Sequence, residues 1–145
     1  MPEVRSSAEV VRGGYAAWNS GDLETFLEYV HPELVWTSSG VFPGLRPTYS
    51  GPEGIRDFWE TFQEPWESFE IAIEEMFQVD SDSVLIKVRF HVKGRETIEL
   101  ERRIVNHLVI RDEKLYRFKG YDQWEEALAD LGIDDPHSKP ASSPE

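Results

Sequence analysis

Glu-Arg-Arg-Ile-Val-Asn-His-Leu-Val-Ile, residues 101–110, is the stretch of sequence from which the fold is inferred. Its β-branched residues and the turn-like segment 111–114 that follows predict a long strand. Alternation assigns its side chains to two faces: Arg102, Ile104, Asn106, Leu108 and Ile110 on one, and Glu101, Arg103, Val105, His107 and Val109 on the other. Both faces are apolar toward Ile110, so we expect the strand to be covered on both sides. The polar groups of the face that carries His107 indicate a lined cavity there.

The flanking sequence alternates between two hydrophobic periods. Steps of three and four residues predict helices at 7–19 and 23–30, a third after the capping residue Ser50, and a short fourth helix capped by Asp122. Period-two alternation predicts strands at 33–38, 66–79 with a bulge near Glu74, 84–93, 97–110 and 114–121. This order indicates an α+β domain: a strongly curved, mostly antiparallel sheet of four to six strands. Three N-terminal helices on its concave face would enclose a cone-shaped pocket.

The composition is that of one folded domain. The chain has 145 residues, of which 39% are hydrophobic and 12% aromatic, enough for a single core and a lined pocket. We expect residues 1–133 to form that domain. Residues 134–145 are rich in Pro and Ser and have no hydrophobic period, which predicts a disordered tail.

The formal net charge of −13 argues against nucleic acid and anionic membrane surfaces as partners, because both carry negative charge. There is no cysteine, which excludes disulfides and Cys-ligated metals. No apolar run approaches the roughly 20 residues of a membrane span, and the N-terminus lacks the apolar core of a signal peptide. The expected location is therefore the cytoplasm.

Five segments, taken together, resemble the SnoaL-like branch of the nuclear transport factor 2-like superfamily. They are Tyr15–Asp22, His31–Trp36, Gly51–Trp59, His107–Leu115, and Tyr121 with Glu125–Leu128. Their order and spacing over residues 8–132 carry the resemblance. It implies a cystatin-like roll with a hydrophobic pocket, and it leaves the activity open because the fold hosts isomerases, cyclases, dehydratases, epoxide hydrolases and binding domains.

The resemblance also suggests positions for polar groups. Members similar to ketosteroid isomerase place an Asp base on the first strand, where this sequence has Thr37, which cannot abstract a proton near neutral pH. The position comparable to their oxyanion-binding acid is His107, and Tyr15 lies near the position of their phenol. The candidate catalytic residues are therefore His107 as acid/base or hydrogen-bond donor, with Tyr15 and Arg103 assisting. The alternative for His107 is a core histidine satisfied by a neighbouring polar group.

Aromatic and neighbouring side chains are the candidates for ligand contact, and the loop 39–49 is a candidate lid over the pocket. The expected ligand-binding residues are Trp18, Trp36, Thr37, Phe58, Trp59, Phe62, Phe90, Val105 and Phe118. No grouping of His, Asp or Glu has metal-ligand spacing, so we expect no metal and no cofactor.

The face that carries Ile104, Leu108 and Ile110 would leave an apolar patch on the outside of the sheet, which predicts a homodimer through that patch. Two functions remain open. One is cofactor-free acid/base chemistry, by an isomerase, cyclase or hydrolase, on a hydrophobic carbonyl or polycyclic compound. The other is a non-catalytic ligand-binding or protein-interaction domain of the same fold.

Overall fold

The structure is a computed structural model, and it describes residues 6–38, 48–63, 66–94 and 99–135. Four helices and six strands follow in the order α1 (Ser7–Asn19), α2 (Leu23–Leu27), β1 (Val30–Thr37), β2 (Thr48–Ser50), α3 (Gly51–Gln63), β3 (Trp66–Asp80), β4 (Ser83–Gly94), β5 (Glu99–Arg111), β6 (Lys114–Tyr121) and α4 (Trp124–Leu131). Most of the predicted disordered tail, and most of the predicted lid, lie outside the described residues.

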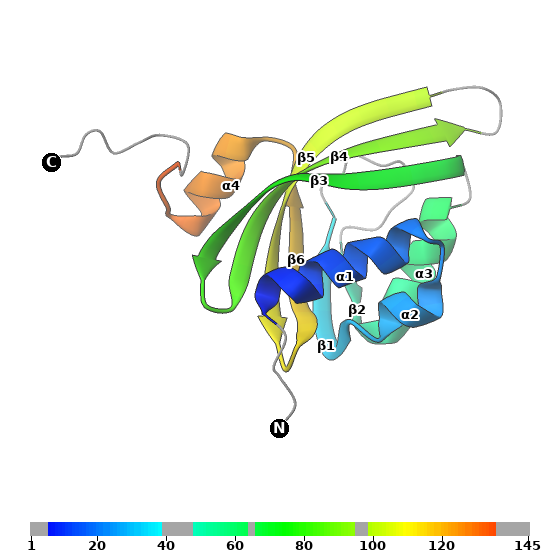
Figure 1. Cartoon of the computed structure of the whole chain (residues 1–145), viewed down its shortest axis with the longest axis horizontal. Helices are drawn as coiled ribbons and strands as arrows, with labels where there is room; N and C mark the ends of the chain where they lie inside the picture. The colour runs from blue at the N-terminus through cyan, green and yellow to red at the C-terminus, as the bar shows by residue number, and fades with distance from the viewer. Residues whose placement is uncertain (1–5, 39–47, 64–65, 95–98, 136–145) are drawn as a thin grey trace, which may run out of the picture.

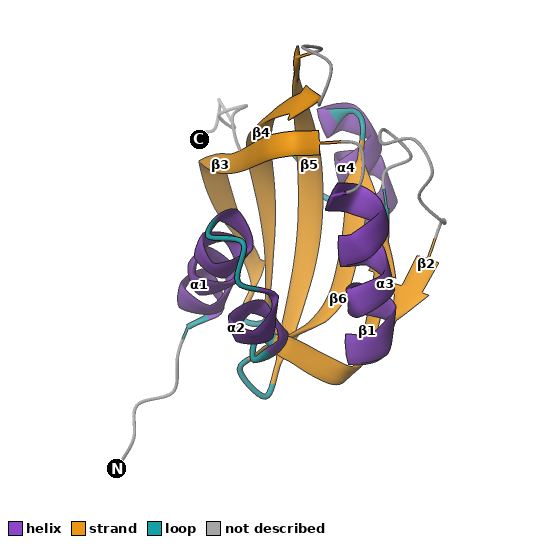
Figure 2. Cartoon of the chain, turned by 90° about the vertical axis from the view of Figure 1, so that its right-hand side faces the viewer, coloured by secondary structure: helices purple, strands orange, loops and turns teal. Residues whose placement is uncertain are grey.

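All six strands belong to one curved sheet in the order β2-β1-β6-β5-β4-β3. Among the strands that the structure describes, only β1 and β6 pair in parallel, and every other neighbouring pair is antiparallel. The helices α1, α2 and α3 cover one face of the sheet, whereas α4 lies on the opposite side (Figures 1 and 2). The predicted α+β class, with three N-terminal helices over the concave face of a mixed sheet, is confirmed.

Strand β3 bends where its sequence predicts an irregularity. Its pairing with β4 shifts register between Ile73 and Glu75, which is the predicted bulge. Strand β1 also starts earlier than predicted, at Val30 instead of Glu33, and α2 ends at Leu27. Pro32 is tolerated in β1 because it lies where the pairing with β6 is interrupted, between Val30 and Val35.

Helix α1 is attached to the sheet at both ends. Its N-terminus has a capping box between Ser6 and Glu9, as the sequence indicates, and the Ser7 hydroxyl donates to the carbonyl of Ser81 in the turn after β3. At the other end, the side-chain amide of Asn19 donates to the Ile71 carbonyl at 2.7 Å and accepts from the Ile71 N–H at 2.8 Å. Because β3 is an edge strand, these two bonds satisfy backbone groups that would otherwise face water.

Two hydrophobic cores lie on opposite faces of the sheet. The larger core packs α1, α2 and α3 against the concave face, and the smaller core packs Leu85, Val105, Tyr121 and Ala127 beneath α4. Helix α4 ends at Gly132 in the left-handed conformation, as predicted. Its N-cap, however, is Gln123, without a side-chain capping bond, so the prediction that Asp122 caps this helix is wrong.

Among the described residues, no helix is both long enough and apolar enough to cross a membrane.

Candidate functional site

A cavity opens between the concave face of the sheet and the helices α1 and α3. Its empty space, including the part open to solvent, is about 820 Å³. Its walls are Val10, Val11, Gly14, Tyr15, Trp18, Phe26, Tyr29, Trp36, Ser38, Phe58, Ile71, Val88, Phe90, Ile104, Asn106, Leu108, Ile110, Leu115, Phe118 and Gly120. No Asp, Glu, His, Lys or Arg is among these described lining residues.

The polar part of the cavity wall is a hydrogen-bonded pair from α1 and β5. The Asn106 side-chain amide donates to the phenol oxygen of Tyr15 at 2.7 Å. Asn106 is 3% exposed, and its Oδ1 atom is buried without a hydrogen-bond partner among the described residues. Burial raises the pKa of the Tyr15 phenol far above its usual value, and the bond from Asn106 only partly opposes this. Tyr15 is therefore neutral near pH 7 and carries a proton that it can donate.

Aromatic rings form much of the remaining wall. Trp36 on β1 stacks on Phe118 of the neighbouring strand β6, with 3.7 Å between ring centroids and 8° between ring planes. Trp18 on α1 meets Phe26 of α2 edge to face, at 5.0 Å between centroids. The Trp36 indole Nε1 is buried and has no hydrogen-bond partner in the described part of the chain. These aromatic walls fit a largely apolar molecule.

Five of the predicted ligand-contact residues line this cavity, namely Trp18, Trp36, Phe58, Phe90 and Phe118, and so does the catalytic candidate Tyr15. Trp59 is buried and packs edge to face on Trp18, without lining the cavity. Thr37 pairs with Lys119 and is not among the lining residues, whereas Ser38 is. The side chain of Phe62 lies outside the described part of the structure.

The predicted orientation of His107, Arg103 and Val105 is wrong. Their face of β5 is the outer face of the sheet: Val105 belongs to the core under α4, and Arg103 is exposed and paired with Glu74 on β3 at 3.0 Å. The cause is the register of β5 on β4, which places Asn106 beside Ile86 in the large core and His107 beside Leu85 in the small one. A shift of one residue would have reversed both faces.

His107 lies near a polar group from β6 and α4 on the outer face. The Tyr121 hydroxyl donates to Asp130 Oδ2, which also accepts from Lys119 at 3.0 Å. Burial lowers the pKa of His107, although the negative charges of Asp80 and Asp130 oppose this effect. The Nε2 atom of His107 is buried with no partner among the described residues. This environment keeps His107 neutral, and it is on the other side of the sheet from the cavity.

The surface predicted for dimer formation is also inside the molecule. Ile104, Leu108 and Ile110 line the cavity and are at most 8% exposed. They are unavailable to a second chain because α1 and the other N-terminal helices cover their face. The outer face at this level is instead covered by the chain's own helix α4 (Figure 1). The homodimer stays a prediction, but Ile104, Leu108 and Ile110 cannot form its interface.

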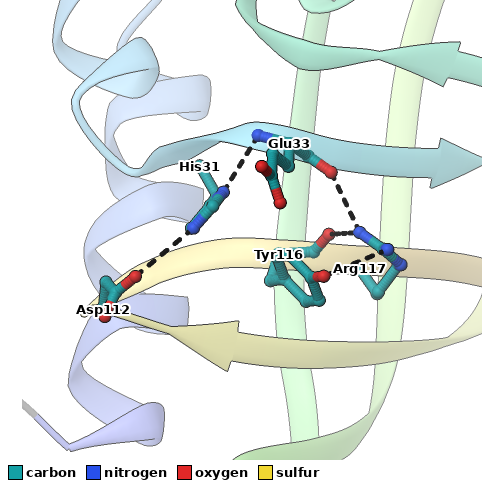
Figure 3. Close-up of polar contacts among 5 residues, drawn as sticks. All are labelled: His31, Glu33, Asp112, Tyr116 and Arg117. Carbon is teal, nitrogen blue, oxygen red and sulfur yellow. Dashed lines mark hydrogen bonds and ion pairs between the residues drawn. The ribbon is translucent and has the colours of Figure 1, made fainter.

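A second polar cluster joins β1 to β6 where their parallel pairing is interrupted (Figure 3). His31 Nδ1 accepts from the Glu33 N–H at 2.9 Å, while its Nε2 faces Asp112 at 3.4 Å. Arg117 donates to the carbonyl oxygens of Glu33 and Tyr116 and stacks on the Tyr116 ring. These bonds satisfy backbone groups that the strands leave unpaired, so the cluster has a structural explanation.

The sequence contains one signal for Asn106, a cavity residue that is not among the predicted site residues. Asn106 is the single polar side chain among Ile104, Leu108 and Ile110 on its face of the strand. A lone amide on an apolar face must find a partner when it is buried, and here that partner is Tyr15.

Comparison with known families identifies the family of this chain. The family model described as a SnoaL-like domain matches residues 11–118, which is most of the chain. This chain belongs to the SnoaL-like domain family. The resemblance seen in the sequence is thereby confirmed. The comparison with curated protein sequences finds no match.

Solved structures share the architecture of this SnoaL-like domain. TerC, co-crystallized with polyporic acid, has a TM-score of 0.73 and 22% identity over 86% of this chain and 96% of its own. A putative SnoaL-like polyketide cyclase from Shewanella denitrificans has a TM-score of 0.68 and 18% identity over 87% and 96%. A Mycobacterium tuberculosis protein in complex with estradiol-17β-hemisuccinate has a TM-score of 0.71 and 16% identity over 83% and 97%. At these identities the likeness concerns the fold alone.

Proposed function

We propose that this SnoaL-like domain binds a small, uncharged, mostly apolar molecule in the cavity between the sheet and the helices. The walls supply aromatic and aliphatic surface, and the Tyr15–Asn106 pair supplies a polar contact that fixes orientation. Two structures of the same fold support the binding of a small, mostly apolar molecule, since TerC was co-crystallized with polyporic acid and the mycobacterial protein is in complex with estradiol-17β-hemisuccinate. The uncharged character of the ligand is inferred from the lining residues of this cavity alone.

One observation favours binding over acid/base catalysis. The described residues that line the cavity include no carboxylate, imidazole or amine. General acid/base catalysis needs a group whose pKa lies near the working pH. Tyr15 does not meet this requirement, because burial moves its pKa away from neutrality. A ligand in this cavity would be held by hydrogen bonds and apolar contacts, and none of the described lining residues would act as a base.

A second candidate function is a cyclase-like or isomerase-like reaction driven by hydrogen bonding alone. The observation that favours it is the neutral, buried Tyr15 phenol, which can donate its proton to an oxygen that gains negative charge. The substrate would then be a hydrophobic carbonyl or polycyclic compound that reacts without a protein base. Turnover of such a compound, lost in Tyr15→Phe, would establish this second function.

The binding proposal is tested by filling the cavity. Gly14 lines the cavity from α1, and an added Cβ would meet only ordinary contacts, at 3.7 Å from Phe26 and 3.9 Å from Tyr29. Gly14→Leu should therefore fold while its side chain occupies the ligand space. Ala16→Leu adds the same side chain on the exposed side of the same helix and is the matched control.

Native mass spectrometry of freshly purified protein would reveal a co-purifying ligand, and calorimetric titration with β-naphthol would supply a defined probe. We expect binding to the wild type and to Ala16→Leu, with a loss of at least tenfold in Gly14→Leu. Equal binding to all three proteins would show that the cavity is not the ligand site.

A further inference from the structure

The cavity is elongated along β5. Four of its lining residues occupy every second position on the concave face of that strand, namely Ile104, Asn106, Leu108 and Ile110. A strand rises by roughly 3.3 Å per residue, so these positions span about 20 Å. A ligand that lies along β5 therefore has a maximum length, which is set by the residues at the two ends of this row.

Tyr29 lies at the Ile110 end of the cavity. Its carbonyl oxygen accepts from the Leu115 N–H at 2.6 Å, and Leu115 pairs with Ile110 across the ladder between β5 and β6. Its own N–H donates to the carbonyl oxygen of Phe26 at 2.9 Å. Tyr29, Leu115 and Ile110 all line the cavity. Because both backbone groups of Tyr29 are bonded, only its side chain can move without breaking a hydrogen bond.

The Tyr29 side chain extends from the cavity wall to a part of α1 outside it. Its Cβ lies 3.9 Å from the position of a Cβ added at Gly14, and Gly14 lines the cavity. Its hydroxyl end lies against Gly13, which is not among the lining residues. The side chain is partly buried against the large core. The ring therefore closes the Ile110 end of the cavity at the point where α1 passes over it.

Gly13 allows the Tyr29 ring to take this position. A Cβ added at Gly13 would lie only 2.5 Å from the phenol oxygen and 2.7 Å from Cζ, so the ring occupies the space that any larger residue would need. Glycine is less favourable than alanine in a helix interior. The close approach of the ring gives this glycine a physical explanation.

We propose, resting on the binding function above, that Tyr29 sets the maximum length of the ligand and is a specificity-determining residue of the cavity. The ligand is a neutral, mostly apolar molecule whose long axis follows β5 and whose end contacts the Tyr29 ring. A longer molecule has to displace the ring from Gly13, because the backbone of Tyr29 is held on both sides.

A homologous series of ligands measures this length. Straight-chain primary alcohols from hexanol to dodecanol are neutral and differ only by CH₂ groups. Each buried CH₂ strengthens binding by about fourfold, so the affinity should rise along the series and level off where the chain reaches Tyr29. Isothermal titration calorimetry on the intact protein, in competition with β-naphthol for the least soluble members, gives the affinities.

Two variants should move this limit to longer alcohols. In Tyr29→Ala the first alcohol beyond the wild-type limit should gain about fourfold or more in affinity, because its last CH₂ is now buried. Gly13→Ala leaves Tyr29 in the chain but displaces its ring from α1, and it should move the limit in the same direction. Tyr29→Phe retains the ring and should restore the wild-type limit.

The outcomes separate this inference from the binding proposal on which it rests. An affinity that rises without levelling off up to dodecanol, or a limit at the same alcohol in wild type and Gly13→Ala, would overturn the role of Tyr29 and leave the binding function standing. Binding of β-naphthol without binding of any alcohol would do the same. Failure of β-naphthol and of every alcohol to bind the wild type would overturn both. Alanine is the better helix former, so Gly13→Ala should fold and decides the question even if Tyr29→Ala does not.

Discussion

The side-chain amide of Asn106 donates to the phenol oxygen of Tyr15 over 2.7 Å, across 91 residues of sequence. The bond joins the middle of β5 to helix α1 and places a polar pair in an otherwise apolar cavity wall. The same pair is central to the proposed function, and its burial indicates that it should also stabilise the fold. The two contributions can be separated by mutation.

A double-mutant cycle on Tyr15 and Asn106 should show strong coupling. Tyr15→Phe removes the bond and leaves the buried amide without its partner, and Asn106→Leu leaves the phenol without one. Each single change should lower the free energy of unfolding by about 1–3 kcal/mol. The double variant removes both polar groups and should be no less stable than either single variant. Chemical denaturation measures these values, and simple additivity of the two losses would contradict the prediction.

Alkaline pH should destabilise the fold through its buried phenols. Burial raises the pKa of Tyr15, and burial together with the bond to the Asp130 carboxylate raises the pKa of Tyr121. In the unfolded chain both would ionise near pH 10. Their contribution to stability is thus complete below about pH 10 and is lost as the pH rises above it. Between about pH 9 and 11 the free energy of unfolding should fall less in Tyr15→Phe than in the wild type, and an equal fall in both would count against the assignment.

Mildly acidic pH should destabilise the fold through His107. Burial holds its pKa below the value of about 6.5 that it has when unfolded, so its neutral form stabilises the fold above that pH. The contribution is lost as the pH falls from about 6.5 through the lower native pKa. We expect the decline in unfolding free energy between about pH 7 and 5 to be smaller in His107→Gln than in the wild type.

The acid response of Asp130 is separable from that of His107. Hydrogen bonds from Tyr121 and Lys119 lower the Asp130 pKa, so its contribution is present above about pH 4 and is lost below it. We therefore expect the stability decline below about pH 4 to be smaller in Asp130→Asn than in the wild type. A wild-type decline confined to pH values below about 4 would contradict the role given to His107.

The attachment of α1 to the sheet edge should depend on Asn19. Its two hydrogen bonds to the backbone of Ile71 are exposed, so Asn19→Ala should cost only about 1 kcal/mol. The sharper measurement is hydrogen exchange of the Ile71 amide, which should become faster because its acceptor is gone. Ser20→Ala removes a bond to Ala17 within the same helix end and should leave Ile71 exchange unchanged.

The sequence predicted the elements well and the faces of the central strand badly. The capping box at Ser6 and the bulge near Glu74 are local features, and local patterns found them. The face of β5 that turns inward depends on the register with β4, which no pattern within β5 records. Because both faces are apolar near Ile110, the sequence pattern favours the polar row containing His107 for the cavity and gives no weight to the single Asn106.

Helix α4 explains why the inward face of β5 could not be predicted from the sequence of that strand alone. It covers the outer face and buries Val105 and Leu85 there, which gives β5 apolar residues on both sides. An apolar outer face can equally indicate a partner chain or the chain's own helix. The sequence places Tyr15, Trp18, Trp36, Phe58, Phe90 and Phe118 at the cavity, and they line it. Trp59, on the enclosing helix α3, packs on Trp18 outside the lining, which the sequence alone does not distinguish.

The central claim is that ligand recognition depends on Asn106 inside the cavity and not on His107 outside it. Isothermal titration of β-naphthol into the wild type, Asn106→Leu and His107→Gln tests this most directly. The account predicts that Asn106→Leu loses tenfold or more in affinity while His107→Gln binds as the wild type does. Unchanged affinity in Asn106→Leu together with a loss in His107→Gln would contradict it.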